Sequence, residues 1–166
     1  MAAPVILTLT LDAASHAFFT ELRTQHFPKH CNYLEAHLTL FHHLSMEVVA
    51  ENLPGIFCDR KSMLLDVTAI KNIGNGVAFA IANDELLQMH KQMQAAFDAH
   101  LVAQDRQRLW PHVTIQNKVT AFKARQTADL LQKDFNPFQI KGIGISAWRY
   151  LDGPWEFLAS YPFNSK

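Results

Sequence analysis

The sequence predicts an α+β fold in which one arrangement of strands and helices occurs twice, and two observations support this prediction. A pattern of His, aliphatic residue, Thr and aliphatic residue occurs at residues 37–40 and again at residues 112–115. Two copies of this pattern would arise in roughly one random shuffle of the chain per hundred. The order strand, helix, motif strand, helix, strand is predicted once from Val5 to Ile73 and again from Val77 to Trp148.

The first half begins with residues 5–11, whose aliphatic and β-branched side chains predict a strand. Asp12 is a typical N-cap for the helix that follows. The first motif strand is expected over residues 36–44. The short helix after it is expected to break or end at Pro54 and Gly55, because proline and glycine disfavour a helix interior.

The second half begins at a predicted hairpin, because Gly74-Asn75-Gly76 is a turn signal between strands over residues 63–73 and 77–82. A helix capped by Asn83 or Asp84 leads toward the second motif strand. The remaining elements are a helix from Thr120 to about Lys133 and two strands, residues 138–150 and 155–161, that turn at Asp152-Gly153-Pro154.

Strand alternation gives each motif one polar face and one apolar face. His37 and Thr39 share a face of the first motif strand, which Phe41 continues, and His112 and Thr114 share the corresponding face of the second. A duplicated unit tends to pack about a pseudo-twofold axis. We therefore expect the two polar faces to turn toward each other across a groove.

Length and composition predict one domain over residues 1–166, made of two pseudo-symmetric lobes at about residues 5–73 and 77–161 that share a core. Fifteen Lys and Arg balance fifteen Asp and Glu, so bulk electrostatics does not favour long nucleic acid as a partner. Cys31 and Cys58 fit no disulfide framework or zinc spacing, and no apolar stretch is long enough to span a membrane. We expect a soluble, cytoplasmic monomer with no membrane partner.

The two motifs suit in-line displacement at phosphorus without a metal or another cofactor. One imidazole of the pair His37 and His112 would take a proton from the attacking group, and the other would give one to the leaving oxygen. The hydroxyl groups of Thr39 and Thr114 would donate hydrogen bonds to the non-bridging oxygens.

These features resemble the 2H phosphoesterase superfamily, in its branch of 2′-5′ RNA ligases and cyclic phosphodiesterases. The resemblance lies in both motifs, in the Trp110-Pro111 pair before the second motif and in the duplicated order, and it covers essentially the whole chain. It implies a bilobal fold in which two antiparallel-rich sheets line a central cleft with helices outside. It also implies metal-independent opening of 2′,3′-cyclic phosphates or related phosphodiesters, with His37 and His112 as the acid and base pair and Thr39 and Thr114 as phosphate binders.

Four further residues are candidates for substrate binding. Phe41 and Tyr150 are expected to stack on a base, although aromatic residues on strands more often belong to the core. Gln116 and Lys118 continue the inward parity of the second motif, and we expect them to contact phosphate or ribose unless they only form a solvated strand end. The expected ligand is a small cyclic nucleotide or an RNA terminus.

Three alternative functions stay open at this point. The chain could be a nucleotide or RNA-end binding module without turnover, although binding alone does not need two titrating groups. It could also join tRNA halves as a 2′-5′ RNA ligase, which the balanced charge disfavours. A metallohydrolase would use His37, His42 and His43, but alternation separates His42 from the other two and no carboxylate stands at ligand spacing.

Overall fold

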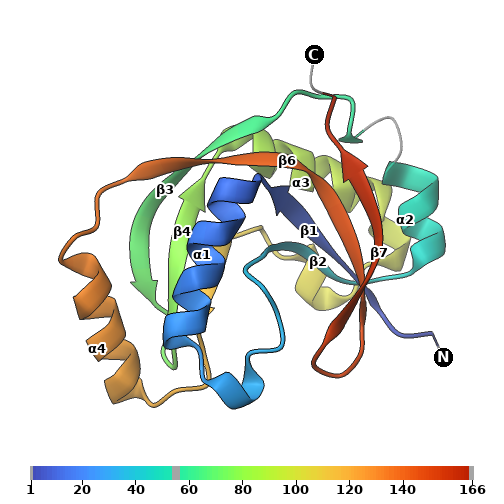
Figure 1. The fold of residues 1–166 in the computed structure, drawn as a ribbon. Helices are drawn as coiled ribbons and strands as arrows, with labels where there is room; N and C mark the ends of the chain where they lie inside the picture. Colours follow the sequence, from blue (N-terminus) through green and yellow to red (C-terminus); the bar gives the residue numbers. More distant parts are fainter. Residues whose placement is uncertain (1, 54–56, 165–166) are drawn as a thin grey trace.

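A computed structural model describes residues 2–53 and 57–164 and shows an α+β fold (Figure 1). Its strands are β1 (Val5–Leu11), β2 (Leu38–Leu44), β3 (Met63–Asn72), β4 (Val77–Ala82), β5 (His112–Gln116), β6 (Phe138–Tyr150) and β7 (Trp155–Pro162). Its helices are α1 (Ala13–His26), α2 (Met46–Asn52), α3 (Asp84–Ala96) and α4 (Ala121–Gln132). The predicted order of elements is confirmed. The predicted helix breaker at Pro54 and Gly55 lies outside the described residues.

The described strands form one antiparallel sheet rather than two separate ones. The strand order is β2-β1-β6-β3-β4-β5, and β7 pairs with β6. The long strand β6 makes the connection, because its first part pairs with β3 while its later part pairs with β1 on one side and β7 on the other. The strands β2 and β5 end this path, yet their residues come within 8 Å of each other between Cα atoms. The sheet therefore curves until the two motif strands face each other.

Helices α1 and α3 each pack on strands that lie in the other region of the sheet. On α1, which follows β1, the ring of Phe19 lies 5.3 Å from that of Phe79 on β4, and α1 also contacts β5. On α3, which follows β4, the ring of His90 stacks 4.6 Å from that of Phe41 on β2. Apolar residues of both regions form one continuous hydrophobic core. The organisation of the chain as one domain of two lobes stays a prediction.

The strand pairing does not separate the halves at the predicted boundary between residues 73 and 77. That boundary falls in the turn of the β3–β4 hairpin, whose strands pair from Asp66 and Ala82 to Asn72 and Val77. Strand β6 carries the chain back to β1 from the far side of the sheet. The pseudo-symmetry of the two lobes stays a prediction, while the pairing of β6 ties both regions together.

A β-bulge follows the threonine of each motif. In β2, Thr39 pairs with Thr8 while Phe41 pairs with Leu7, so Leu40 is an extra residue. In β5, Thr114 pairs with Ala78 while Gln116 pairs with Val77, so Ile115 is an extra residue. A bulge reverses the alternation of the side chains beyond it. The residue two positions after each threonine therefore lies on the opposite face from the one that strict alternation predicts.

Candidate active site

Both motif histidines are held in the same way by their own backbone. The Nδ1–H of His37 donates to the carbonyl oxygen of Glu35 at 2.8 Å, and that of His112 donates to the carbonyl oxygen of Trp110 at 2.7 Å. A carbonyl only accepts, so Nδ1 carries the proton in each neutral ring and Nε2 keeps a free lone pair. Within residues 2–53 and 57–164, neither Nε2 makes a hydrogen bond to protein. Each ring is therefore oriented as a base.

The curvature of the sheet brings the two motifs together. His37 directly precedes β2, and His112 is the first residue of β5, which approaches β2. Thr39 and Thr114 are partly exposed, while the aliphatic residues between them and the histidines, Leu38 and Val113, are fully buried. This is the arrangement that alternation predicted for the first three residues of each motif.

Burial disfavours the protonated form of both imidazoles in the free protein. Burial lowers the pKa of His37 to about 4, and the charges of Arg23, His112 and His42 act in the same direction, while the hydrogen bond to Glu35 opposes them. Burial also lowers the pKa of His112, against the hydrogen bond to Trp110. A phosphate anion between the rings would raise both pKa values and allow one ring to hold a proton.

Arg23 on α1 connects the segments that carry the two motifs. Its guanidinium donates to the Leu34 carbonyl and the Asn32 side chain, just before His37, and to the Thr114 carbonyl in β5 at 3.0 Å. The side chain is 3% exposed, and burial lowers its pKa to about 10. The sequence interpretation missed this residue, although Arg23 lies four positions after Phe19 and therefore on the buried stripe of its helix.

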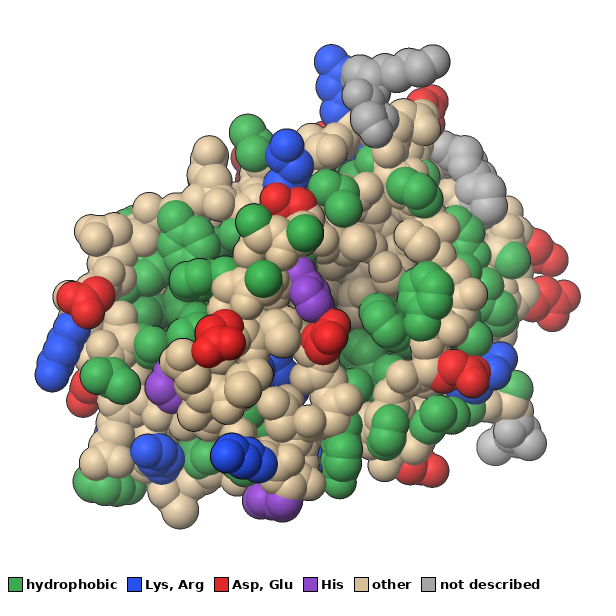
Figure 2. All heavy atoms as spheres, in the orientation of Figure 1, with side chains coloured by type: hydrophobic (Ala, Val, Ile, Leu, Met, Phe, Trp, Pro, Cys, Tyr) green, Lys and Arg blue, Asp and Glu red, His purple; other side chains and the backbone are tan. Residues whose placement is uncertain are grey.

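A cavity of about 380 Å³ lies beside His37. The space-filling view is hollowed in this region, between α1 and β7 (Figure 2). None of the described lining residues is Lys or Arg, so the cavity suits an uncharged aromatic or polar group. Besides His37, its principal lining residues are Thr8, Thr10, Tyr33, Trp148, Trp155 and Phe157.

Two of the predicted binding residues are placed wrongly by strict alternation. Phe41 is fully buried and stacks on His90 behind the sheet, and Gln116 is fully buried with its amide donating to Thr127 on α4 at 2.8 Å. The bulges at Leu40 and Ile115 turn both side chains toward the core. Neither side chain offers a surface to a ligand.

The other two predicted binding residues are exposed. Lys118 lies beyond the end of β5 in the left-handed region, with φ of 62°, and Tyr150 lies at the end of β6 near the β6–β7 turn. Tyr150 does not belong to the described lining of the cavity beside His37, where the aromatic wall is instead formed by Trp148, Trp155 and Phe157. A ligand contact by Lys118 or Tyr150 stays a prediction.

The metal hypothesis finds no donor set in the described part of the chain. No three His, Cys, Asp or Glu side chains there come together as metal ligands. The reason given from sequence was wrong in one respect, because the bulge places His42 on the same face as Thr39. His43 instead lines a separate hollow together with residues of the N-terminal segment.

The family of the chain follows from a match to a family model. The model described as the 2′-5′ RNA ligase superfamily matches residues 11–154. The chain therefore belongs to this superfamily, which confirms the resemblance to 2H phosphoesterases. No curated protein matches the sequence.

Solved structures share the fold at low sequence identity. TT0787 of Thermus thermophilus has a TM-score of 0.64 and 14% identity, and the match covers 96% of this chain and 97% of that one. E. coli LigT complexed with 3′-AMP has a TM-score of 0.62 and 12% identity, with 99% of each chain covered. A structure described as a phosphoesterase has a TM-score of 0.59 and 13% identity, with 99% of each chain covered. The predicted fold class is confirmed by these similarities.

No described helix is both long and apolar enough to cross a lipid bilayer.

Proposed function

We propose that this protein is a metal-independent phosphodiesterase that hydrolyses a 2′,3′-cyclic phosphate or a related phosphodiester at an RNA end. The observation that carries the proposal is the matched pair of imidazoles on two facing strands. Each ring is fixed through Nδ1 by the carbonyl two residues before it, keeps an Nε2 that no described protein group binds and is followed by a threonine on the same face. Nucleotide binding alone would not require this matched pair of proton acceptors.

The reaction needs both rings in different protonation states. One neutral Nε2 takes a proton from water as the water oxygen attacks phosphorus, and the protonated ring gives its proton to the ribose oxygen that leaves. The Thr39 and Thr114 hydroxyl groups donate to the non-bridging oxygens as negative charge builds there. The products are a ribose hydroxyl and a phosphate monoester.

The cavity beside His37 is the proposed seat of the nucleoside. Its aromatic wall suits base stacking, and its lack of cationic lining leaves the phosphate to the histidines and threonines. Structures of E. coli LigT with 3′-AMP, NADP⁺ and ATP show that a protein of this fold binds small nucleotides. The cytoplasmic location, the monomeric state and a role in RNA processing stay predictions.

A product assay tests the proposal. Purified protein with EDTA is incubated with the four 2′,3′-cyclic nucleotides, and with short RNAs that carry a cyclic end or a 2′-5′ bond. We expect a phosphate monoester from at least one substrate, and much slower product formation by His37→Ala or His112→Ala. Binding without product from any substrate would favour the non-catalytic nucleotide-binding module. A joined product from RNA halves would favour ligation.

A further inference from the structure

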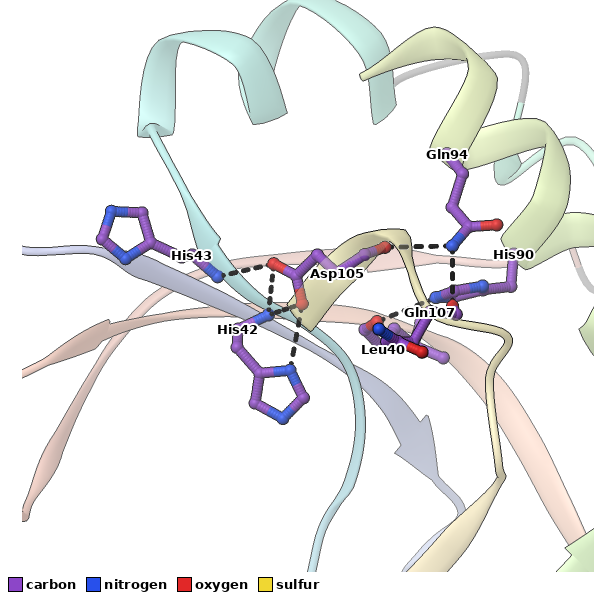
Figure 3. A network of polar contacts seen from close by, with 7 residues as sticks. All are labelled: Leu40, His42, His43, His90, Gln94, Asp105 and Gln107. Carbon is purple, nitrogen blue, oxygen red and sulfur yellow. Dashed lines mark hydrogen bonds and ion pairs between the residues drawn. The ribbon is translucent and has the colours of Figure 1, made fainter. Parts of the chain in front are cut away.

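A buried carboxylate outside the two motifs binds the strand of the first one. Asp105 lies in the helical turn Ala103–Arg106 and is 3% exposed. Its oxygens accept 2.9 Å hydrogen bonds from the backbone N–H groups of His42 and His43, and a 3.0 Å bond from Nδ1–H of His42 (Figure 3). Burial alone would raise the pKa of Asp105, but the hydrogen bonds from His42 and His43 outweigh it and lower that pKa, so this carboxylate is ionised at neutral pH.

The ring of His42 belongs to the same face as the first motif. The bulge at Leu40 puts Phe41 into the core and returns His42 to the side of Thr39. The His42 side chain is 46% exposed, whereas that of its partner Asp105 is 1% exposed. In Figure 3 the rings of His42 and His43 point in different directions. The His42 imidazole is thus partly exposed and is held by a hydrogen bond to the buried carboxylate of Asp105.

His42 lies close enough to both motif histidines for its charge to reach them. A positive charge on His42 lowers the pKa of His37 and that of His112. The charged or titratable groups that interact with these rings include Arg23 and the carboxylate of Asp105. Of these, Arg23 already donates to two backbone carbonyls and one amide side chain. His42 is more exposed than Arg23 and is therefore more accessible to a phosphate.

A purely structural role for His42 would explain the hydrogen bond from its backbone to Asp105, but not the bond from its ring. The His43 N–H donates to Oδ2, and the His42 N–H is shared between Oδ1 and Oδ2, so the backbone holds the bulged edge strand without any help from the ring. The Nδ1 bond adds orientation, because it fixes the tautomer and leaves Nε2 directed away from Asp105.

We propose that His42, oriented by Asp105, is a third substrate-binding residue that donates Nε2–H to a non-bridging oxygen of the substrate phosphate. The proposal rests on the proposed function, since it assigns a role at the same site. It adds an oriented N–H donor to a site whose other proposed phosphate contacts are two hydroxyl groups and the reacting imidazoles. No bond is made or broken at His42.

Asparagine and glutamine separate the two ends of the imidazole. The side-chain amide of Asn lies near the position of Nδ1, and that of Gln lies near the position of Nε2. His42→Asn therefore keeps a donor for Asp105 and loses the phosphate contact, whereas His42→Gln keeps a neutral donor toward the phosphate. We expect kcat/KM to fall about 10- to 100-fold in His42→Asn, mainly through KM, and less in His42→Gln. His43→Asn and His43→Gln are matched controls and should behave as wild type.

The test separates this inference from the proposed function. If wild type turns over a substrate and His42→Asn matches it in kcat and KM, the inference is overturned. If wild type turns over nothing in the panel, 3′-AMP binding decides instead, with weaker binding expected in His42→Asn than in His43→Asn and equal binding overturning the role. NMR on the wild-type protein tests the same contact and does not depend on whether a variant folds. The His42 ring signals should shift on addition of 3′-AMP, and unchanged signals would contradict the contact.

Discussion

The two motif strands share the same backbone features and differ in the side chains around them. In each copy a carbonyl two residues before the histidine fixes Nδ1, and a bulge after the threonine turns the following side chain into the core. Beyond the bulge, the first strand presents His42 and the second presents Asn117. Backbone geometry is thus shared by the two motif strands, while the side chains around it differ.

The surroundings of the two rings also differ. His37 borders the aromatic cavity, with the ring of Trp155 at 4.6 Å and an interplanar angle of 50°. His112 is covered by Trp110 at 4.2 Å and 19°, which is parallel stacking. We interpret the His37 side as the nucleoside side of the site and the His112 side as the open side. The predictions below test whether the two motif histidines, which are held in the same geometry, contribute equally to catalysis.

The largest effect is expected from the two motif histidines themselves. His37→Ala and His112→Ala should each lower kcat by about 100- to 10,000-fold, because each removes one proton-transfer group. Steady-state kinetics on any substrate that wild type turns over measures this. The exposed His100→Ala is the control and should retain wild-type kcat. A large loss in only one of the two variants would break the equivalence of the copies.

Arg23 should matter to both copies at once. Arg23→Met leaves the carbonyls of Leu34 and Thr114 and the Asn32 side chain without their donor, at a cost of about 1–3 kcal/mol for each unpaired buried group. We expect the free energy of unfolding to fall by about 2–5 kcal/mol in urea denaturation. Arg125→Met, on the exposed face of α4, should change it by less than about 0.5 kcal/mol. Equal stability of the two variants would contradict the role of Arg23 in connecting the two motif segments.

Residue pattern predicted the order of elements and the facing pair of motifs, because strand alternation and turn residues are local signals. The bulges left no local signal, since Leu40 and Ile115 are aliphatic like ordinary core residues, and so the parity of Phe41 and Gln116 was predicted wrongly. Asp105 and Trp155 come to the site from distant parts of the chain. Tertiary contacts decide their positions, which no spacing in the sequence reveals.

The pH dependence of stability should report on the burial of both rings. The pKa of His37 is lowered to about 4 in the folded state, below the ordinary value of 6.5, so its contribution is complete above pH 6.5 and is lost as pH falls toward 4. Between pH 6.5 and 4, His37 binds a proton in the unfolded chain but not in the folded chain. We expect the free energy of unfolding to fall less steeply over this window in His37→Ala than in wild type, by on the order of 1–2 kcal/mol.

Urea denaturation at several pH values between 7 and 4 measures that difference. The pKa of His112 is lowered as well, so His112→Ala should also flatten the curve, and the exposed His30→Ala should follow wild type. A His37→Ala curve parallel to that of wild type would mean that the His37 ring takes up a proton freely in the folded protein.

The smallest effects are expected from the two tryptophans, and their kinds should differ. Trp155→Leu removes part of the cavity wall and should raise KM about tenfold with little change in kcat, since base stacking contributes about 1–3 kcal/mol. Trp110→Leu removes the aromatic face that is stacked on His112, at about 0.5–1 kcal/mol, so kcat should change two- to fivefold. Phe122→Leu, exposed on α4, is the control. A rise in KM alone for both tryptophan variants would place the nucleoside between the rings and end the distinction between the two sides.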